Sequence, residues 1–578
     1  MGLGQRHRPQ HGRRGDHRHG PHGDHQAGRP PAPQVAQARH PGALRRARSE
    51  DPGSPGALRR HDPPVAEGRG LTRPACFVRP RLDWTDVSDS TAALSQVQAS
   101  AVAELLEATP LIGELGRLFA EAGEEIYLVG GSVRDALLDR LGHDLDFTTS
   151  AGPDRTEELL RSFSRTVWTV GKQFGTIGAA RKSDGREWAV EVTTFRADAY
   201  SPESRKPVVA FGDNITDDLV RRDFTVNAMA IDVAGRAFVD PHGGLKDLAR
   251  KVLRTPSPPQ VSFSDDPLRM MRAARFAAQL GFSVEPATFN AMTSMHERIS
   301  IVSAERVRDE LSKLLLSDTP RPGLNLLVGS GLADVILPEL PAMRLERDEH
   351  FRHKDVYEHS LTVLDQAIAL EKARDYKNGR PNPDHEPDLV IRLAALLHDI
   401  GKPATRGLDG GKVTFHHHDV VGAKLARKRL RALHYPKNVV EAVSQLIEQH
   451  LRFHGYGEQS WTDSAVRRYV RDAGDQLEHL HILTRSDCTT RNRRKAEALR
   501  RAYDELEARI DELSAQEELE AIRPDLDGNQ IMEILGIGPG PEVGKAYKHL
   551  LALRMDEGPL GAERATAELR AWWQDQPH

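Results

Sequence analysis

The chain has almost no cysteine and no long hydrophobic run. Its 578 residues include only Cys76 and Cys488, so at most one disulfide can form and no CxxC zinc motif exists. No stretch of 18 apolar residues occurs, and the N-terminus has no hydrophobic segment of the secretory kind. These absences argue against a disulfide-rich secreted scaffold, a zinc ribbon and a membrane-spanning protein, and they predict a cytoplasmic location.

Residues 1 to about 86 contain no Lys, Ile, Tyr or Asn, and the first lysine of the chain is Lys172. The same stretch is rich in Arg, Pro and Gly and holds eight of the 26 histidines. Such a composition cannot bury a core and predicts disorder. Because the missing residue types have A/T-rich codons, we hypothesise that residues 1–90 are a disordered or non-native leader, with Val87 as the native start.

The remaining length suggests several domains, and the charges nearly balance. There are 80 Lys and Arg against 84 Asp and Glu, which gives a formal net charge of -4. A length prior for 578 residues predicts three or four domains. A near-neutral net charge of the whole chain does not exclude a local basic surface that binds nucleic acid.

Two carboxylates stand two positions apart in the segment IYLVGGSVRDALLDRLGHDLDF, which begins at Ile126. We expect a buried strand, a glycine turn, a helix over SVRDALLDRL and a second strand that carries Asp144 and Asp146. Side chains alternate across a strand, so both carboxylates project from one face. Ionised carboxylates repel each other unless a cation bridges them, and oxygen ligands of this kind suit Mg2+.

The glycine turn before the helix predicts a phosphate-binding site. Gly130 and Gly131 allow the backbone to approach a phosphate chain closely, and the free N–H groups of the following helix attract anions. Arg134, in the same helix, can pair with phosphate oxygens. An exposed strand end with solvated acids is the alternative, but it explains neither the glycines nor the arginine.

Asp266, Arg269, Arg272 and Arg275 recur every three residues in DDPLRMMRAARF. This spacing predicts one side of a helix. An arginine offers donors and an aspartate offers acceptors, which together can read a base edge. A solvated helix face with internal ion pairs is the simpler interpretation of the spacing taken alone.

A second constellation lies in the C-terminal half. LAALLHDIGKPATR places His398 and Asp399 at the end of an apolar segment, and DVYEHSLTVL places His359 on another helix. Histidines and carboxylates of this kind can hold a transition metal with open positions for water.

The first set of motifs resembles the polymerase-beta-type nucleotidyltransferases of the tRNA CCA-adding and poly(A) polymerase family, in its bacterial class II form. GGSVRD followed by DLDF resembles the catalytic signature, LVRRDFTVNAMAID the second motif, DDPLRMMRAARF the template motif, and SAERVRDELSKLL the neck-helix motif. The resemblance implies that Asp144 and Asp146 are catalytic and hold Mg2+. It implies nucleotide binding by Gly130, Gly131, Arg134, Arg222, Asp223, Asp266, Arg269, Arg272 and Arg275.

Within that set, the resemblance makes Asp266 and Arg269 a protein template for incoming C or A. Arg272 and Arg275 would hold phosphate or support the template. The family usually has Glu before the template Asp, whereas this chain has Asp265, so Asp265 is left out of the pair.

The second constellation resembles the HD phosphohydrolase superfamily. That resemblance implies a divalent metal of open identity held by His359, His398, Asp399 and Asp487. It further implies that His418 and His450 bind a phosphate or a second metal.

These resemblances imply an α+β multidomain fold. A polymerase-beta-like nucleotidyltransferase head with a mixed sheet and helices would be followed by all-α neck, HD and tail domains. The expected divisions are residues 91–250 for the head, 251–345 for the neck and nucleotide-template domain, 346–510 for the HD domain, and 511–578 for a helical RNA-binding tail.

The implied activity is addition or repair of the 3′-terminal CCA of tRNA from CTP and ATP without a nucleic-acid template. The RNA 3′ hydroxyl would attack the nucleotide α-phosphate, and pyrophosphate would leave. Three alternatives stay open: a poly(A) polymerase or an enzyme adding only CC or only A; an HD phosphohydrolase whose head only binds RNA; and a non-enzymatic RNA scaffold. FRADAYSPESRKP, residues 195–207, resembles the flexible loop that family members need for switching to A, which favours full CCA addition.

Overall fold

The protein is described from a computed structural model. It covers residues 98–576 except residues 101, 104, 108, 184, 197–198, 202–203, 209–210, 345–354, 376–379, 382–385, 456–460, 490–491 and 518–522. The leader hypothesis for residues 1–90 therefore lies outside the described residues. Among the described helices, none combines the length and the apolar character that a bilayer crossing needs.

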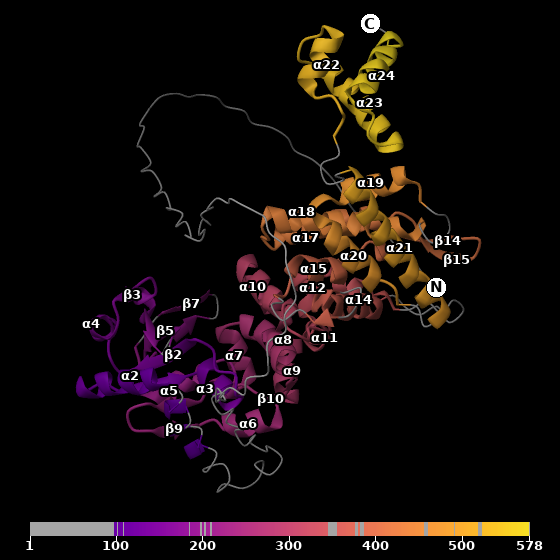
Figure 1. Cartoon of the computed structure of the whole chain (residues 1–578). Helices are drawn as coiled ribbons and strands as arrows, with labels where there is room; N and C mark the ends of the chain where they lie inside the picture. Colours follow the sequence, from indigo (N-terminus) through magenta and orange to yellow (C-terminus); the bar gives the residue numbers. More distant parts are fainter. Residues whose placement is uncertain are drawn as a thin grey trace, which may run out of the picture. The chain divides into compact units, whose positions relative to one another are not determined.

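The N-terminal part is built on a seven-stranded mixed sheet (Figure 1). Only the neighbours β2 and β5 run parallel, and every other neighbouring pair is antiparallel. This agrees with the expected mixed sheet. The spatial order is β3 (Thr166–Trp168), β4 (Thr176–Ser183), β5 (Arg186–Thr194), β2 (Asp144–Thr149), β1 (Ile126–Val129), β8 (Ala230–Asp232) and β9 (Ala237–Val239).

Helices cover one face of this sheet, and the other face is open around the paired carboxylates. Alternate residues of the central strands, such as Phe147 and Val192, are fully buried. They share one hydrophobic core with apolar residues of the helices α2 (Pro110–Glu121) and α4 (Pro153–Phe163). Asp144 and Asp146 alternate with buried residues and are exposed. The alternation that the sequence showed thus sorts apolar side chains into the core and carboxylates onto the open face.

Shorter elements complete the head. α3 (Gly131–Leu137) joins β1 to β2, and the hairpin β6–β7 falls in the stretch predicted to be the flexible loop. The other elements are η1 (Lys172–Phe174), β6 (Ala199–Ser201), β7 (Ser204–Val208), α5 (Ile215–Val220), η2 (Thr225–Asn227) and α6 (Gly244–Arg250).

The neck that follows is helical, apart from the two-residue parallel strands β10 (Val252–Leu253) and β11 (Ser283–Val284). Its central helix α8 packs against α10 and α11. The neck helices are α7 (Pro259–Asp265), α8 (Leu268–Leu280), α9 (Pro286–Met295), η3 (His296–Ile301), α10 (Ala304–Leu315), α11 (Arg321–Gly329), α12 (Leu332–Ile336) and α13 (Glu339–Ala342).

The next part is also mainly helical, with two small hairpins that the sequence did not predict. These are β12 (Ala373–Asp375) with β13 (Arg380–Pro381), and β14 (Arg406–Asp409) with β15 (Lys412–Phe415). The helices are α14 (Val356–Glu371), α15 (Leu389–Leu397), α16 (Lys402–Thr405), α17 (His418–Ala432), α18 (Lys437–Gln449), η4 (Arg452–Gly455), α19 (Asp463–Ala473), η5 (Gly474–Gln476), α20 (Leu477–Ser486) and α21 (Arg493–Glu517).

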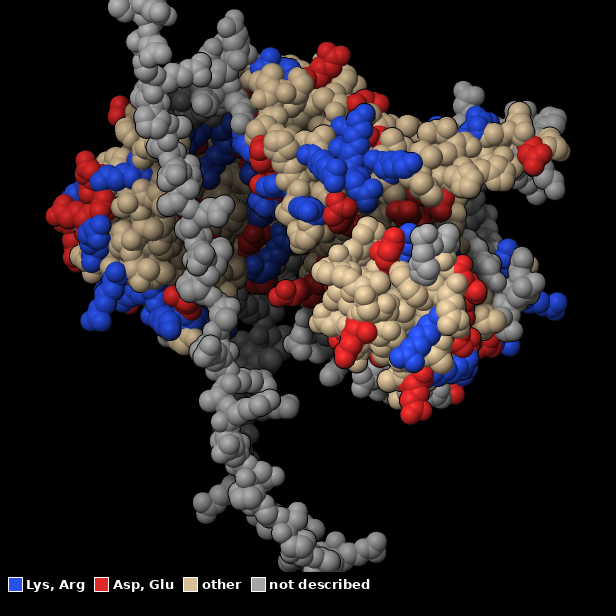
Figure 2. Space-filling view, turned by 90° about the horizontal axis from the view of Figure 1, so that it is seen from above, with Lys and Arg blue, Asp and Glu red and all other residues tan. Residues whose placement is uncertain are grey.

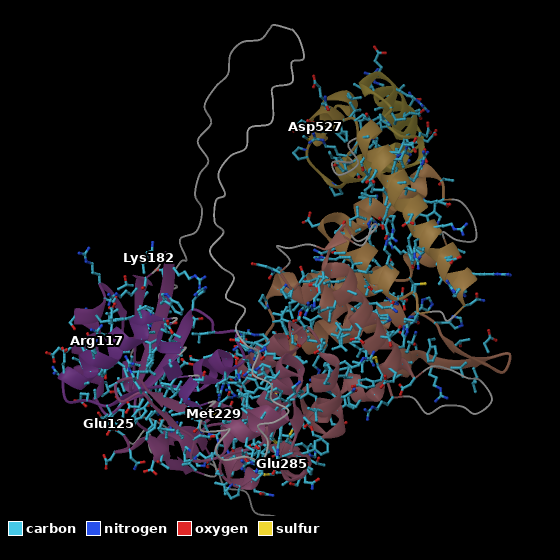
Figure 3. The ribbon with its side chains drawn as sticks, turned by 60° about the horizontal axis from the view of Figure 1, so that its bottom comes forward. Arg117, Glu125, Lys182, Met229, Glu285 and Asp527 are labelled. Atoms are coloured by element: carbon cyan, nitrogen blue, oxygen red, sulfur yellow. The ribbon has the colours of Figure 1, made fainter. Side chains whose placement is uncertain are left out.

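The tail has three helices with a small hydrophobic core of their own: α22 (Gly528–Leu535), α23 (Pro541–Glu557) and α24 (Ala562–Gln574). The sequence predicted a helix pair around GIGPGPEVGK; the structure places α22 and α23 there and adds α24. Figure 3 shows side chains throughout the described chain, with Lys182 on β4 of the head, Glu285 before α9 of the neck and Asp527 before α22 of the tail.

Two local predictions were wrong. The helix expected over residues 132–141 ends at Leu137, and Asp139 beyond it adopts a left-handed backbone with φ of 55°. Asp266 does not lie on the helix that carries the three arginines. Its backbone is extended at the end of α7, and Pro267 separates it from α8, because a residue before proline avoids the helical region.

Candidate functional site: a nucleotide pocket and a histidine–aspartate cluster

Three carboxylates meet on the open face of the head sheet. β2 pairs in parallel with β5 so that Asp146 lies directly opposite Glu191, and Asp144 lies two residues earlier on β2. Asp146 is exposed to solvent, but the surrounding protein partly desolvates its carboxyl group, and this raises its pKa. The charge of Arg222 opposes the rise, and that of Asp144 adds to it. Desolvation also raises the pKa of Glu191, as do the charges of Asp146 and Asp144. The cluster is therefore short of positive charge.

A cavity of about 400 Å³ adjoins Asp146 and brings together motifs that are far apart in the sequence. Six arginines and three aspartates line it, so its walls carry an excess of positive charge that suits a polyphosphate. The lining residues are Gly130, Gly131, Arg134, Asp146, Arg222, Asp223, Asn227, Asp266, Arg269, Arg272, Arg275, Phe276 and Arg306. Of the head and neck residues that the sequence predicted for the site, only Asp144 is outside this lining.

The glycine turn is shaped by a close approach of arginine. Gly130 has φ of 70°, and a Cβ built on it would stand 2.9 Å from Nη1 of Arg222. Arg222 is held by an ion pair of 2.9 Å with the buried Asp218. The positive φ therefore favours a glycine at this position, and Arg222 lies close beside the turn.

Arg134 is fixed rather than free. Its Nη1 donates to Oδ1 of Asn227 at 2.5 Å, and its Nε and Nη2 donate to Asp135. Ser132 ties α3 to β2, because its Oγ accepts a hydrogen bond from the N–H of Asp146 at 3.0 Å. The turn, the helix and β2 are therefore linked by direct hydrogen bonds.

The buried Asp223 forms an ion pair with the half-buried Arg272, the middle arginine of α8. Arg272 donates to Oδ2 of Asp223 from Nε at 2.8 Å and from Nη2 at 2.5 Å. Burial alone would raise the pKa of Asp223, but the Arg272 charge and hydrogen bonds from Asn227 and from the Phe224 N–H hold it well below its usual range. This pair locks the second motif of the head to α8.

Arg275 is engaged in the same way on the next turn of the helix. Its Nε donates to Glu310 of α10 at 2.6 Å, and both side chains are buried. Arg272 and Arg275 therefore anchor α8 to the head and to α10, and both also line the cavity.

The expected template pair sits in the cavity wall. Arg269 is only 6% exposed; its Nη1 donates to Ser262 Oγ at 2.7 Å and its Nη2 to the carbonyl of Arg221 at 2.5 Å. Asp266 accepts the N–H of Leu268 at 3.1 Å and pairs with Arg306 at 3.2 Å. These contacts fix a donor fork and a carboxylate at the edge of the same cavity.

Sequence reasoning missed Glu191, Asn227, Phe276 and Arg306. Glu191 had a readable signal, because it is the polar residue between Val190 and Val192 in a strand with strict alternation. For the other three, only the tertiary fold shows that they reach the cavity.

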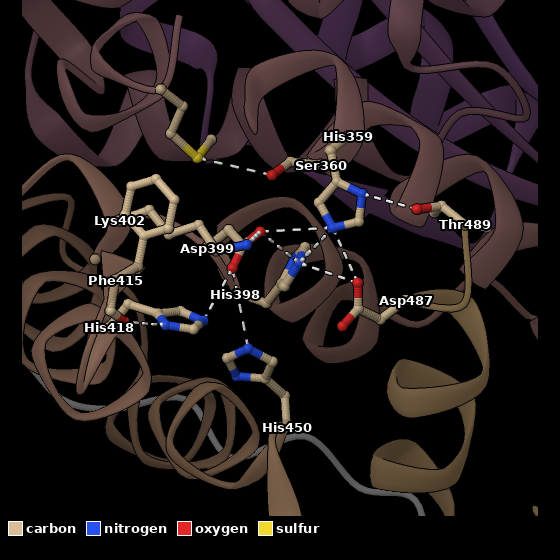
Figure 4. A network of polar contacts seen from close by, with 12 residues as sticks. His359, Ser360, His398, Asp399, Lys402, Phe415, His418, His450, Asp487 and Thr489 are labelled. Atoms are coloured by element: carbon tan, nitrogen blue, oxygen red, sulfur yellow. Dashed lines mark hydrogen bonds and ion pairs between the residues drawn. The ribbon is translucent and has the colours of Figure 1, made fainter. Parts of the chain in front are cut away.

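The second constellation also assembles as expected (Figure 4). Nε2 of His359 lies 3.4 Å from Nε2 of His398, 3.5 Å from Oδ2 of Asp399 and 2.9 Å from Oδ1 of Asp487. Nε2 of His398 lies 3.3 Å from the same Asp399 oxygen. Two histidines and two aspartates from three distant segments thus face one point.

His418 and His450 face the other oxygen of the same aspartate. Their Nε2 atoms lie 3.3 and 4.0 Å from Asp399 Oδ1. Both Nδ1 atoms donate to backbone carbonyls, His418 to Phe415 at 2.8 Å and His450 to Ile447 at 2.6 Å, so both Nε2 atoms carry lone pairs in the neutral rings. Three buried acceptors without a hydrogen-bond donor therefore point at one another.

Burial and neighbouring charges shift the ionisation of this cluster. Burial and the charge of His398 together lower the pKa of His450 to about 4, so the His450 ring is neutral near pH 7. Burial alone would raise the pKa of Asp399, but the charges of His398 and Lys402 hold it well below its usual range. Lys402 Nζ lies 2.6 Å from Asp399 Oδ2.

Basic side chains form patches interrupted by acidic ones (Figure 2). In the Arg-rich segments of α17 and α19 many guanidinium groups are paired within the protein. Arg429 pairs with Glu339 at 2.8 Å and Arg431 with Glu441 at 2.9 Å, and the buried Arg467 donates to the carbonyl of Met555 at 3.1 Å. These segments contribute to internal packing as well as to surface charge.

Comparison with known proteins accounts for this arrangement. Models of the poly(A) polymerase head domain, of a probable RNA- and SrmB-binding site of polymerase A, and of the HD domain match residues 126–254, 281–343 and 356–492. An A-adding tRNA nucleotidyltransferase of Deinococcus radiodurans is 35% identical over 460 residues, which cover 78% of this chain and 96% of that protein. The chain belongs to the poly(A) polymerase and tRNA nucleotidyltransferase family. It is a nucleotidyltransferase with an HD domain.

Other members are similar over part of the chain or in fold. A CCA-adding enzyme of Levilactobacillus brevis is 43% identical over 213 residues, 37% of this chain and 51% of that protein. The structure of the Bacillus stearothermophilus CCA-adding enzyme with CTP matches with a TM-score of 0.58 at 24% identity, covering 81% of this chain and 98% of that one. The Thermotoga maritima enzyme with tRNA matches at 0.52 and 18% identity, covering 81% and 96%. At these identities the structures show the shared fold.

Proposed function

We propose that this nucleotidyltransferase completes or repairs the 3′-terminal CCA of tRNA, using CTP and ATP. The observation that carries the proposal is the cavity of about 400 Å³, in which an arginine-rich wall, a donor–acceptor pair and Asp146 meet. A triphosphate, a base edge and a reacting hydroxyl need those three features in one place.

The carboxylate cluster fits a divalent cation, and we propose Mg2+. Desolvation and mutual repulsion raise the pKa values of Asp146 and Glu191, so a cation beside them would relieve the repulsion. Oxygen ligands that share the cation with substrate phosphate match the coordination that Mg2+ prefers. When bound to Asp144 and Asp146, it would neutralise phosphate charge and favour ionisation of the attacking hydroxyl.

The chain's own residues would hold the nucleotide in place. The Gly130–Gly131 turn lets phosphate approach the backbone, and Arg222 stands beside it. Arg269 and Asp266 would present donors and an acceptor to the base edge. Arg272 and Arg275 would keep α8 in position through Asp223 and Glu310. These roles agree with a reaction in which positioning and charge stabilisation do most of the work.

Members of the family differ in which nucleotides they add. Full CCA addition is favoured by the resemblance of residues 195–207 to the loop that family members need for switching to A; β6 lies within this stretch and pairs with β7. Addition of A alone is the second candidate, because the Deinococcus radiodurans relative that matches over 96% of its length is an A-adding enzyme.

One assay tests both. Purified protein is offered tRNA transcripts lacking CCA, CA or A, with labelled CTP or ATP. Stepwise addition of C, C and A supports the CCA assignment. Incorporation of A only onto a CC end would assign it to the A-adding enzymes, and long A tails would make it a poly(A) polymerase.

The HD cluster supports a second function, metal-dependent hydrolysis of a phosphate ester. The supporting observation is the three buried acceptors on Asp399, His418 and His450 that face one another without a donor. We propose that His359, His398, Asp399 and Asp487 hold one metal ion and that Asp399, His418 and His450 hold a second. Neutral imidazoles and a bridging carboxylate suit transition metals, which would activate water. Hydrolysis of bis(p-nitrophenyl) phosphate that depends on added metal and is lost in Asp399→Ala would support this; equal activity in both proteins would refute it.

A further inference from the structure

The open face of the head sheet carries an aromatic side chain in line with the carboxylates. Asp146 lies opposite Glu191 across β2 and β5, and Glu191 lies opposite Gly178 across β5 and β4. Gly178 in turn lies opposite Trp168 on the edge strand β3. Directly opposed residues project from the same face of a sheet, so these four positions form one row across it.

Gly178 leaves room for the indole to lie over β4. A Cβ built on Gly178 would stand 2.0 Å from Cε2 and 2.2 Å from Nε1 of Trp168, so the ring occupies the space that a side chain would fill. Since strands are about 4.8 Å apart, the ring lies roughly one strand from Glu191 and about 10 Å from the strand of Asp146. Trp168 is half-buried, which leaves part of the ring open to solvent.

In-line displacement indicates on which side of β2 the 3′ end of the RNA approaches the reacting phosphate. In the sheet, β1 with its glycine turn lies on one side of β2, and β5 with Glu191 lies on the other. Gly130 and Arg222, which we propose to contact the phosphates, line the cavity on the β1 side of β2. In-line displacement places the attacking and leaving oxygens on opposite sides of the phosphorus. If pyrophosphate leaves on the β1 side, the 3′ hydroxyl arrives over β5.

We propose that Trp168 is a stacking platform for one of the last bases of the tRNA acceptor strand. This inference rests on the proposed function and assigns a binding residue to the RNA side of the same site. Stacking on an aromatic ring accepts any base, which suits an end that changes with each nucleotide added. The turn after β3 extends the surface with further exposed apolar side chains, Val170 at 87% and Phe174 at 51% exposure.

Kinetics of Trp168→Ala and Trp168→Phe test the platform. For Trp168→Ala, the KM for a tRNA transcript lacking its terminal A should rise roughly 5- to 150-fold, the range for losing one stacked base. The KM for ATP should stay within about twofold of the wild-type value, and Trp168→Phe should recover most of the loss. Gly178→Ala should shift the KM for RNA in the same direction, because its methyl group would displace the indole.

Trp188→Phe is the matched control. Trp188 lies on β5, is 7% exposed and packs in the core on the opposite face of the same sheet. Its substitution should leave the KM for RNA unchanged. Thermal unfolding of each variant reports whether the head stays folded, and Trp168→Phe provides a folded comparison if Trp168→Ala does not.

A crosslinking experiment locates the contact independently of turnover. A photoreactive benzoylphenylalanine at position 168 should crosslink within the last three nucleotides of 5′-labelled tRNA. Crosslinks confined to the acceptor stem or the elbow, or none at all, would overturn the proposal, as would an unchanged KM for RNA in Trp168→Ala. A wild-type protein that adds no nucleotide to any transcript would instead refute the proposed function, and crosslinking would still report on the platform.

Discussion

Glu191 and Asp146 stand directly opposite each other on the parallel strands β5 and β2, with Asp144 two residues from Asp146 on the same strand. The pKa values of both Glu191 and Asp146 are raised by desolvation and by the neighbouring carboxylates. A group held in that position contributes to the field that draws a cation to the site, even where it makes no direct bond to it.

We therefore expect Glu191→Gln to weaken catalysis without abolishing it. Nucleotide incorporation should fall between about tenfold and 100-fold, the range for groups that support a metal site. The Mg2+ concentration for half-maximal rate should rise, because one negative charge is lost. Asp144→Asn and Asp146→Asn should be nearly inactive at any Mg2+ concentration. A Glu191→Gln enzyme with wild-type rate and Mg2+ dependence would exclude this role.

The ion pair between Asp223 and Arg272 should stabilise the head. Asp223→Asn removes an acceptor of two charged hydrogen bonds, so unfolding should become easier by about 1.5–3 kcal/mol near pH 7. Urea denaturation followed by tryptophan fluorescence measures this, in a background in which Trp461, Trp572 and Trp573 are replaced by Phe so that only the tryptophans of the head remain in the described part of the chain. Asp213→Asn, at an exposed position before α5, is the control and should have little effect.

The same pair predicts a pH dependence with a defined sign. The pKa of Asp223 is lower in the folded protein than in the unfolded chain, so the carboxylate stabilises the fold above the unfolded pKa of about 3.9. That contribution is lost as the pH falls through the folded pKa. The difference in unfolding free energy between wild type and Asp223→Asn should shrink steadily below about pH 4.

How far the sequence predicts this molecule depends on the range of the interaction. Strand alternation placed Asp144 and Asp146 on one face, and the family resemblance carried by local motifs predicted the mixed sheet and the helical domains. Side chains held by partners far along the chain were harder to interpret. Arg134 proved to be bonded to Asn227, and Asp223 proved to be paired with Arg272. No local pattern specifies partners that lie 93 and 49 residues away.

The bend before α8 shows a second limit. A three-residue spacing predicted one helix face for Asp266 and the arginines, but Pro267 places Asp266 in an extended segment before the helix. The proline outweighs the spacing because it restricts the backbone of the preceding residue. The carboxylate still reaches the cavity, by another route than the one predicted.

Metal binding at the HD cluster should separate from nucleotide addition. His450→Ala and His418→Ala should each bind one metal ion fewer than wild type after dialysis, as counted by inductively coupled plasma mass spectrometry. Asp399→Ala, which removes the shared carboxylate, should lose both ions. Incorporation of nucleotides by all three variants should remain at the wild-type level. A parallel loss of that incorporation would show that the two sites depend on each other.

The final prediction concerns base selection by Arg269. Ser262 Oγ and the Arg221 carbonyl each accept a hydrogen bond from its guanidinium, which fixes the direction of the remaining donors. Arg269→Lys cannot reproduce this planar fork, so kcat/KM should fall by roughly 5- to 150-fold for the correct nucleotide, as for the loss of a bidentate base contact. Ser262→Ala removes one support outside the cavity lining and should cost about tenfold.

The measurement that decides between base reading and simple charge is misincorporation. Arg269→Lys keeps the positive charge, so phosphate binding alone would leave discrimination against UTP and GTP intact. If Arg269 reads the base, the ratio of correct to incorrect incorporation should drop in Arg269→Lys and, to a smaller extent, in Ser262→Ala. An unchanged ratio in both variants would assign Arg269 to the support of α8, alongside Arg272 and Arg275.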